Sequence, residues 1–133
     1  MDRDQLIEKI KSLGLECRIE GEYIRAVAPE GNGYCRISVE GDDLFYIRKD
    51  GVCLTVDGFD LITILEQMSP RRPLSPRYVV VADEKEIGDG IGRGTIVGEF
   101  DTDEALEDFL KNSEWRNFTV YGPKDFKYVS VSQ

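Results

Sequence analysis

The fold is decided between residues 15 and 56, which read LECRIEGEYIRAVAPEGNGYCRISVEGDDLFYIRKDGVCLTV. Apolar and polar residues alternate here in short runs, and a period of two is typical of half-buried strands. The runs predict strands over residues 15–20, 22–28, 33–39, 44–49 and 52–56. Glycine, asparagine, aspartate or proline marks each break, and Asp50-Gly51 is a strong signal for a two-residue hairpin. The segment therefore predicts an antiparallel β-meander.

Helices are predicted on both sides of this meander. Asp2 and Gln5 have the spacing of a capping box, and apolar residues follow at helical intervals up to residue 13. A second helix follows Asp57, with Phe59 among its apolar positions. A third is predicted over residues 102–112, with Asp101 and Glu104 as its cap and a buried stripe at Ala105, Leu106, Phe109 and Leu110.

The rest of the chain predicts a second lobe. Strands are expected near residues 78–82, 95–100, 118–121 and 126–131, around the third helix. The fold class is therefore α+β: an antiparallel meander with flanking helices, followed by a ββαββ lobe. Residues 69–77, which read SPRRPLSPR, predict a Pro/Arg-rich linker between lobes 1–68 and 78–133. One core shared by both lobes is the alternative.

Composition excludes several classes of chemistry. The 133 residues contain no histidine, which removes histidine-based nucleophile triads, histidine general bases and most zinc sites. The three cysteines, Cys17, Cys35 and Cys53, form no CxxC pair and are expected to pack as small strand residues. Arg18 and Arg36 directly follow two of them but should point to the opposite face. We expect no catalytic residue, no metal and no cofactor; an enzyme that uses carboxylates or a cysteine is the least supported hypothesis.

The chain is expected to be cytoplasmic. No stretch approaches the roughly 18 to 20 apolar residues of a membrane helix, so no membrane partner is predicted. The N-terminus is charged and lacks a signal-peptide pattern, and three cysteines suit a reducing compartment. Oligomeric state is left open.

Charge favours a basic protein as the partner. Seventeen basic residues against 26 acidic ones give a net charge of -9, which repels phosphates and argues against direct nucleic-acid binding. The leading hypothesis is a non-catalytic acidic protein-binding module, such as a small inhibitor, an immunity-type factor or an anti-defence antagonist of a nucleic-acid-handling protein. The expected partner-binding residues are Glu40, Asp42, Asp43, Asp83, Glu84 and Glu86.

The alternative hypothesis is a binding domain for a small anionic ligand or nucleotide. Its basis is a loop with glycine at every second position, which could wrap a phosphate with backbone N–H groups. The candidate residues are Gly88, Gly90, Gly92, Arg93 and Gly94. Because this loop leads into a predicted strand, whereas a dinucleotide loop opens into a helix, a plain hairpin is the favoured interpretation.

Overall fold

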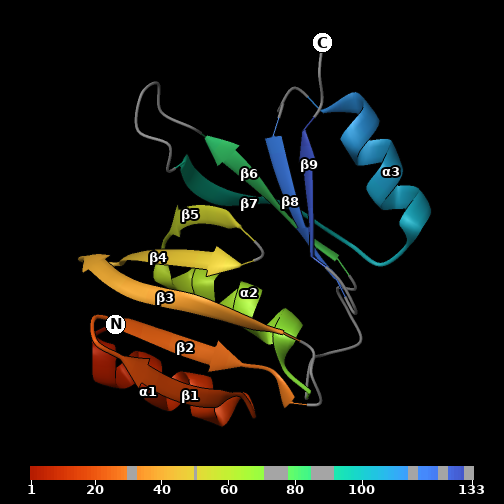
Figure 1. Cartoon of the computed structure of the whole chain (residues 1–133). Helices are drawn as coiled ribbons and strands as arrows, with labels where there is room; N and C mark the ends of the chain where they lie inside the picture. Colours follow the sequence, from red (N-terminus) through yellow and green to blue (C-terminus); the bar gives the residue numbers. More distant parts are fainter. Residues whose placement is uncertain are drawn as a thin grey trace.

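The computed structural model describes residues 1–29, 33–49, 51–70, 78–84, 92–113, 117–122 and 126–130. Nine strands of the described chain form one sheet in the order β1-β2-β3-β4-β5-β7-β6-β8-β9 (Figure 1). The strands are β1 (Glu16–Glu20), β2 (Tyr23–Val27), β3 (Tyr34–Gly41), β4 (Leu44–Lys49), β5 (Val52–Val56), β6 (Tyr78–Glu84), β7 (Gly92–Phe100), β8 (Asn117–Tyr121) and β9 (Phe126–Ser130). The helices are α1 (Arg3–Ser12), α2 (Gly58–Met68) and α3 (Asp103–Asn112). The predicted α+β class is confirmed.

Strands β1 to β5 form the predicted meander. Each pairs antiparallel with the next, β4 and β5 have the predicted bounds, and β1 to β3 begin one residue later than predicted. A register shift between Val39 and Gly41 marks a β-bulge in β3, which therefore runs two residues beyond its predicted end. After α2 the sheet continues through β7, which pairs parallel with β5.

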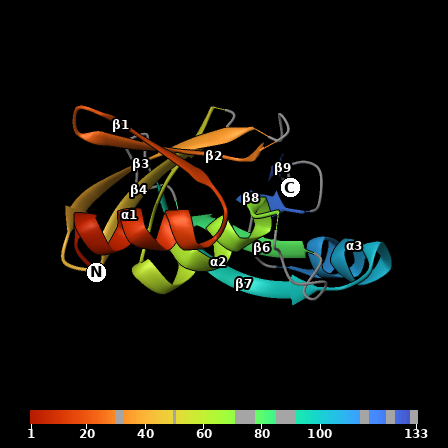
Figure 2. The same cartoon turned by 90° about the horizontal axis from the view of Figure 1, so that it is seen from below.

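Helices α1 and α2 cover the same face of the meander (Figure 2). Alternate strand residues such as Ile24, Ile37 and Ile47 are fully or almost fully buried in one cluster with Leu6 of α1 and Leu61 of α2. The residues between them point the other way because successive strand side chains alternate in direction. We call the face of β1 to β5 away from α1 and α2 the open face.

Helix α3 packs on the opposite side of the sheet from α2. Val79 and Val81 of β6 join the α1 and α2 cluster, whereas Val80 joins a second cluster that the half-buried side of α3 covers. The predicted cap was wrong by one residue: Thr102 is the N-cap, and its hydroxyl accepts a hydrogen bond from the Ala105 backbone N–H at 3.1 Å. Ala105 itself is exposed, so the stripe consists of the three larger apolar residues.

The sheet crosses the predicted lobe boundary. Tyr121 and two valines of β6 are buried together with residues of the meander and its helices. At the end of α2, the buried Ser69 donates a hydrogen bond to the Leu13 carbonyl beside α1. Residues 71–77 of the predicted linker lie outside the described residues, and the division into two lobes stays a prediction. In the described part of the chain, no helix has both the length and the apolar content to cross a membrane.

Gly94 provides a test of the packing between β7 and its neighbours. A Cβ at this position would lie 2.9 Å from Val81 Cγ1 and 3.2 Å from Val56 Cγ1. We expect Gly94→Ala to lower the free energy of unfolding by about 1–3 kcal/mol through overpacking, measured by urea denaturation. Gly41→Ala is the control, since the nearest atom there, Leu44 Cβ, is 4.0 Å away. Equal stability of the two variants would contradict the packing at Gly94.

Asp60 provides a test through pH. Burial raises the pKa of this carboxyl above its ordinary value of 3.8 and nearby Asp57 acts in the same direction, while a hydrogen bond from the Ile96 N–H and the charge of Arg93 oppose the rise. Because the pKa of Asp60 is higher in the folded chain than in the unfolded chain, the folded chain keeps the Asp60 proton at pH values where the unfolded chain has released it. The free energy of unfolding therefore falls as pH rises from 3.8 through the raised value. We expect Asp60→Asn to remove this fall, measured by denaturation across that range. Asp4→Asn, at an exposed aspartate, should keep it; parallel pH profiles for wild type and Asp60→Asn would contradict the assignment.

Candidate functional site

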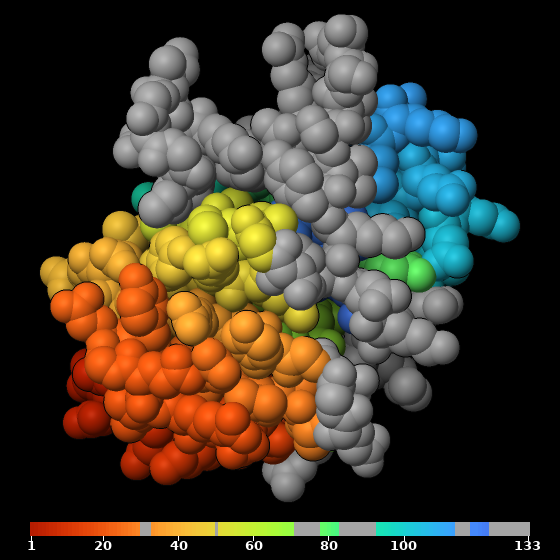
Figure 3. Space-filling view, in the orientation of Figure 1, coloured from red at the N-terminus to blue at the C-terminus, as the bar shows by residue number. Residues whose placement is uncertain are grey.

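Four arginines stand side by side across the open face. The strand registers place Arg18 opposite Arg25, Arg25 opposite Arg36 and Arg36 opposite Arg48. Directly opposite residues share a face of the sheet, and the buried isoleucines beside Arg25, Arg36 and Arg48 occupy the other face. The four arginines, called here the arginine row, therefore lie on the surface that Figure 3 shows over the meander.

Carboxylates compensate one end of the arginine row. Glu16 Oε1 lies 3.0 Å from Arg18 Nε, and Glu20 lies 2.8 Å from Arg25 Nε and 3.7 Å from Arg36 Nη2. No described carboxylate lies within ion-pair distance of Arg48, which is exposed. The uncompensated positive charge of the row is therefore concentrated on β4.

Tyrosine rings alternate with the guanidinium groups. The Arg25 guanidinium lies 4.5 Å from the centre of the Tyr34 ring, and that of Arg36 lies 6.0 Å from the Tyr23 ring. Tyr23 and Tyr46 make an edge-on contact with their ring centres 6.4 Å apart. Tyr34 is 49% exposed and Tyr23 is 41% exposed, so ring surface remains available to a ligand.

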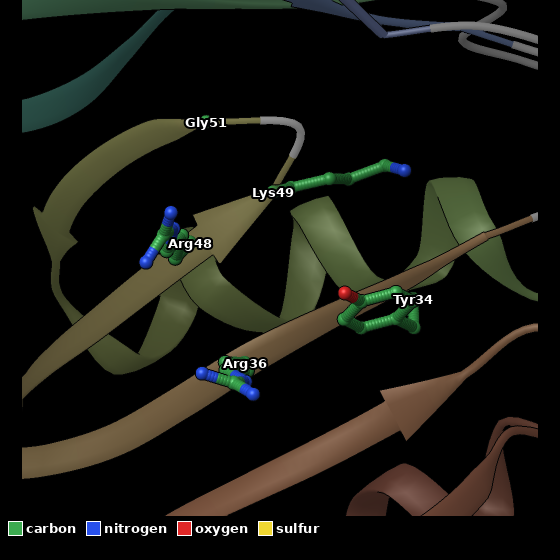
Figure 4. A pocket seen from close by; sticks show the side chains of 5 residues that line it. All are labelled: Tyr34, Arg36, Arg48, Lys49 and Gly51. Carbon is green, nitrogen blue, oxygen red and sulfur yellow. The ribbon is translucent and has the colours of Figure 1, made fainter.

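A pocket lies at the β4 end of the row. It has a volume of about 310 Å³, and Figure 4 shows Arg48 and Lys49 of β4 on one side with Tyr34 and Arg36 of β3 on the other. Gly51 completes the lining. Three cationic side chains and one tyrosine line this hollow, so N–H donors and an aromatic ring predominate, a set that suits an anionic group.

Arg93 extends the positive charge onto β7. In the parallel pair of β5 and β7, Arg93 lies opposite Thr55 and so shares the open face, while Gly94 faces the core. Gly92, Arg93 and Gly94 belong to a strand, so the expectation of a glycine-rich loop at these three positions was wrong. Gly88 and Gly90 lie outside the described residues. Arg93 is thus an exposed cation on the open face and belongs to a strand, not to the predicted loop.

The thiols offer little nucleophilic chemistry. Burial raises the pKa of Cys35 to about 12 and also raises that of Cys17, so both stay protonated at neutral pH. Cys53 lies opposite Arg48 on the open face and accepts a 3.2 Å hydrogen bond from the Tyr46 hydroxyl. Burial, and secondly Cys53 itself, raise the pKa of Tyr46 to about 12. Among the described residues, no group of three or more Cys, Asp or Glu could hold a metal ion.

The predicted acidic residues are divided between two places. Glu40 and Asp42 are exposed at the β3–β4 hairpin, where the Ser38 hydroxyl donates to Glu40 at 2.6 Å. Asp43 lies in the same hairpin, whereas Asp83 and Glu84 lie on β6, separated from β4 by β5 and β7. Glu86 lies outside the described residues. The hypothesis of an acidic surface for a basic protein stays a prediction.

Arg25, Arg36 and Arg48 are not among the site residues predicted from the sequence. Each occupies a polar position in an alternating run, directly beside an isoleucine at position 24, 37 or 47. The recurring Ile-Arg or Arg-Ile pair was a usable signal, because burial of the isoleucines sends every arginine to the same face.

A search against protein-family models, curated proteins and solved structures found no match to this chain.

Asp43 has a structural role that mutation can separate from partner binding. Its Oδ1 accepts a hydrogen bond from the Gly58 N–H at 2.9 Å, at the first turn of α2, and its φ is 50°. We expect Asp43→Ala to lower the free energy of unfolding by about 1–2 kcal/mol, because it loses this acceptor and places alanine in a left-handed conformation. Asp43→Asn keeps an acceptor and tolerates that conformation, so it should retain most of the stability in thermal denaturation. An equal loss in both variants would contradict the capping role.

Proposed function

We propose that this chain is a non-catalytic binding module that takes an anionic partner on its open face. The observation that carries the proposal is the arginine row, in which three successive cross-strand pairs each join two like charges. Like charges directly opposite in a sheet destabilise it. Glu16 and Glu20 offset part of this repulsion, but no described carboxylate pairs with Arg48, and local departures from stabilising patterns are expected at functional sites.

The surroundings of the row support the same function. Arg93 adds positive charge on the face that α1 and α2 leave uncovered, and Arg36, Arg48 and Lys49 line the pocket at the β4 end of the row. Guanidinium groups form two parallel hydrogen bonds to phosphate or carboxylate, which gives them both affinity and orientation for such ligands. The net charge of -9 does not oppose this function, because only charges within about one Debye length, roughly 8 Å at physiological salt, act strongly on a bound group.

We also propose a cytoplasmic location. All three cysteines are free thiols, and persistent free thiols are typical of reducing compartments.

Retention on a heparin column tests the anion-binding function. A protein with a pI near 4.5 should pass through a polyanion column at neutral pH unless a local basic surface binds it. We expect the wild type to be retained at low salt and Arg48→Gln to elute earlier. Lys9→Gln removes the same charge from the exposed side of α1 and should elute with the wild type.

A further variant tests the direction of the effect. Glu20→Gln removes the carboxylate that pairs with Arg25 and Arg36, so it should elute later than the wild type. Passage of the wild type through the column at low salt, or equal losses for Arg48→Gln and Lys9→Gln, would overturn the proposed function.

A further inference from the structure

We infer that the anionic partner is a single-stranded nucleic acid, with its phosphates along the arginine row and a base at Tyr34. The inference rests on the proposed function and names the class of polyanion. Proteins that bind single strands combine a positively charged track for the backbone with aromatic rings on which bases stack. The open face contains both components in adjacent positions, since each of Arg25 and Arg36 has its guanidinium over a tyrosine ring.

The shape of the charged surface fits a narrow chain. Adjacent strands are about 4.8 Å apart, so the four arginines form a line of roughly 15 Å that crosses the strands. The line is one residue wide on each strand. Glu16 pairs with Arg18 at its β1 end, Glu20 pairs with Arg25 and Arg36 in its middle, and Glu40 lies beyond Ser38. A double helix presents phosphates from two strands across a broad surface and would bring some of them against these carboxylates. A single strand along the line needs to displace only Glu20 from Arg25 and Arg36 and Glu16 from Arg18.

The pocket supplies the position for one phosphate and one base. Arg48 and Lys49 lie on one side, and Arg48 has no described carboxylate to displace. Tyr34 lies on the other side, with one ring face occupied by the Arg25 guanidinium at 4.5 Å. A base that stacks here extends an existing arginine–tyrosine stack, while the phosphate next to it meets Arg48 and Lys49. A carboxylate-rich peptide satisfies the cations but has no planar group for the tyrosine.

The test is fluorescence anisotropy with the full chain and a labelled oligothymidylate of about 12 nucleotides, a length within the range that single-strand-binding folds cover. A duplex of equal length and polyglutamate of matched charge are the competitors. We expect the single strand to bind most tightly, with an affinity that falls as salt rises by a slope of about 0.7 per phosphate contacted.

Variants separate the phosphate contact from the stacking contact. Arg48→Gln should weaken binding of the oligothymidylate about tenfold and reduce the salt slope by about 0.7, whereas Lys9→Gln should change neither. Tyr34→Leu should weaken binding by about 5-fold to 100-fold with an unchanged slope, since it removes stacking alone. Tyr34→Phe keeps the ring and should bind like the wild type. Circular dichroism of each variant checks that the fold is retained.

The outcomes distinguish the two proposals. Binding of polyglutamate or duplex as tight as that of the single strand, with the same loss in Arg48→Gln, overturns the single-strand inference and leaves the anion-binding function in place. Tyr34→Leu without effect on the oligothymidylate also overturns the inference. Failure of all three polyanions to bind overturns both proposals.

Discussion

Burial of one face of the meander against α1 and α2 is the constraint on which the rest of the structure depends. Ile24, Ile37 and Ile47 come into register in the core, and Leu54 continues the line on β5. Burying one such side chain stabilises the fold by about 1.5–3 kcal/mol. Like charges that face each other across two strands destabilise the sheet, but Glu20 pairs with both Arg25 and Arg36 and offsets part of that repulsion. The apolar contacts therefore outweigh the repulsion on the other face. The arginine row lies on the opposite face of the same strands from Ile24, Ile37 and Ile47.

The β-bulge in β3 decides which cations become neighbours. Gly41 lies opposite Leu44, and the same register continued without a shift would set Arg36 opposite Lys49. With the bulge, Arg36 lies opposite Arg48 and Ile37 opposite Ile47, so apolar and charged residues separate onto the two faces. The hairpin beyond the bulge places Asp43 at the start of α2. The bulge in β3 therefore affects both the contact of Asp43 with the start of α2 and the set of charged residues on the open face.

The distribution of charge explains how an acidic chain can present a basic surface. Most carboxylates of the described residues lie on helices and hairpins, where capping, solvation or a hydrogen bond accounts for residues such as Asp2, Asp57 and Asp43. The sheet interior of the open face carries arginine and tyrosine instead. Glu20 shares its two oxygens between Arg25 and Arg36, which lowers the repulsion within the row while Arg48 stays accessible. Net charge averages these regions and does not describe the surface that a ligand meets.

The sequence by itself determined the local structure of this protein. Alternation, turn residues and caps located the meander, the Asp2 capping box and the α+β class, because each depends on contacts between residues close in the chain. Thr102 rather than Asp101 caps α3 through a local hydrogen bond from the Ala105 N–H, which either residue type could accept, whereas the exposure of Phe59 (80%) was decided by how α2 meets the sheet. The arginine row and its pocket were decided by tertiary structure alone. The isoleucines beside Arg25, Arg36 and Arg48 indicate that these arginines share a face, but strand registers and one bulge bring residues 18, 25, 36 and 48 into one row, and local spacing does not determine those registers.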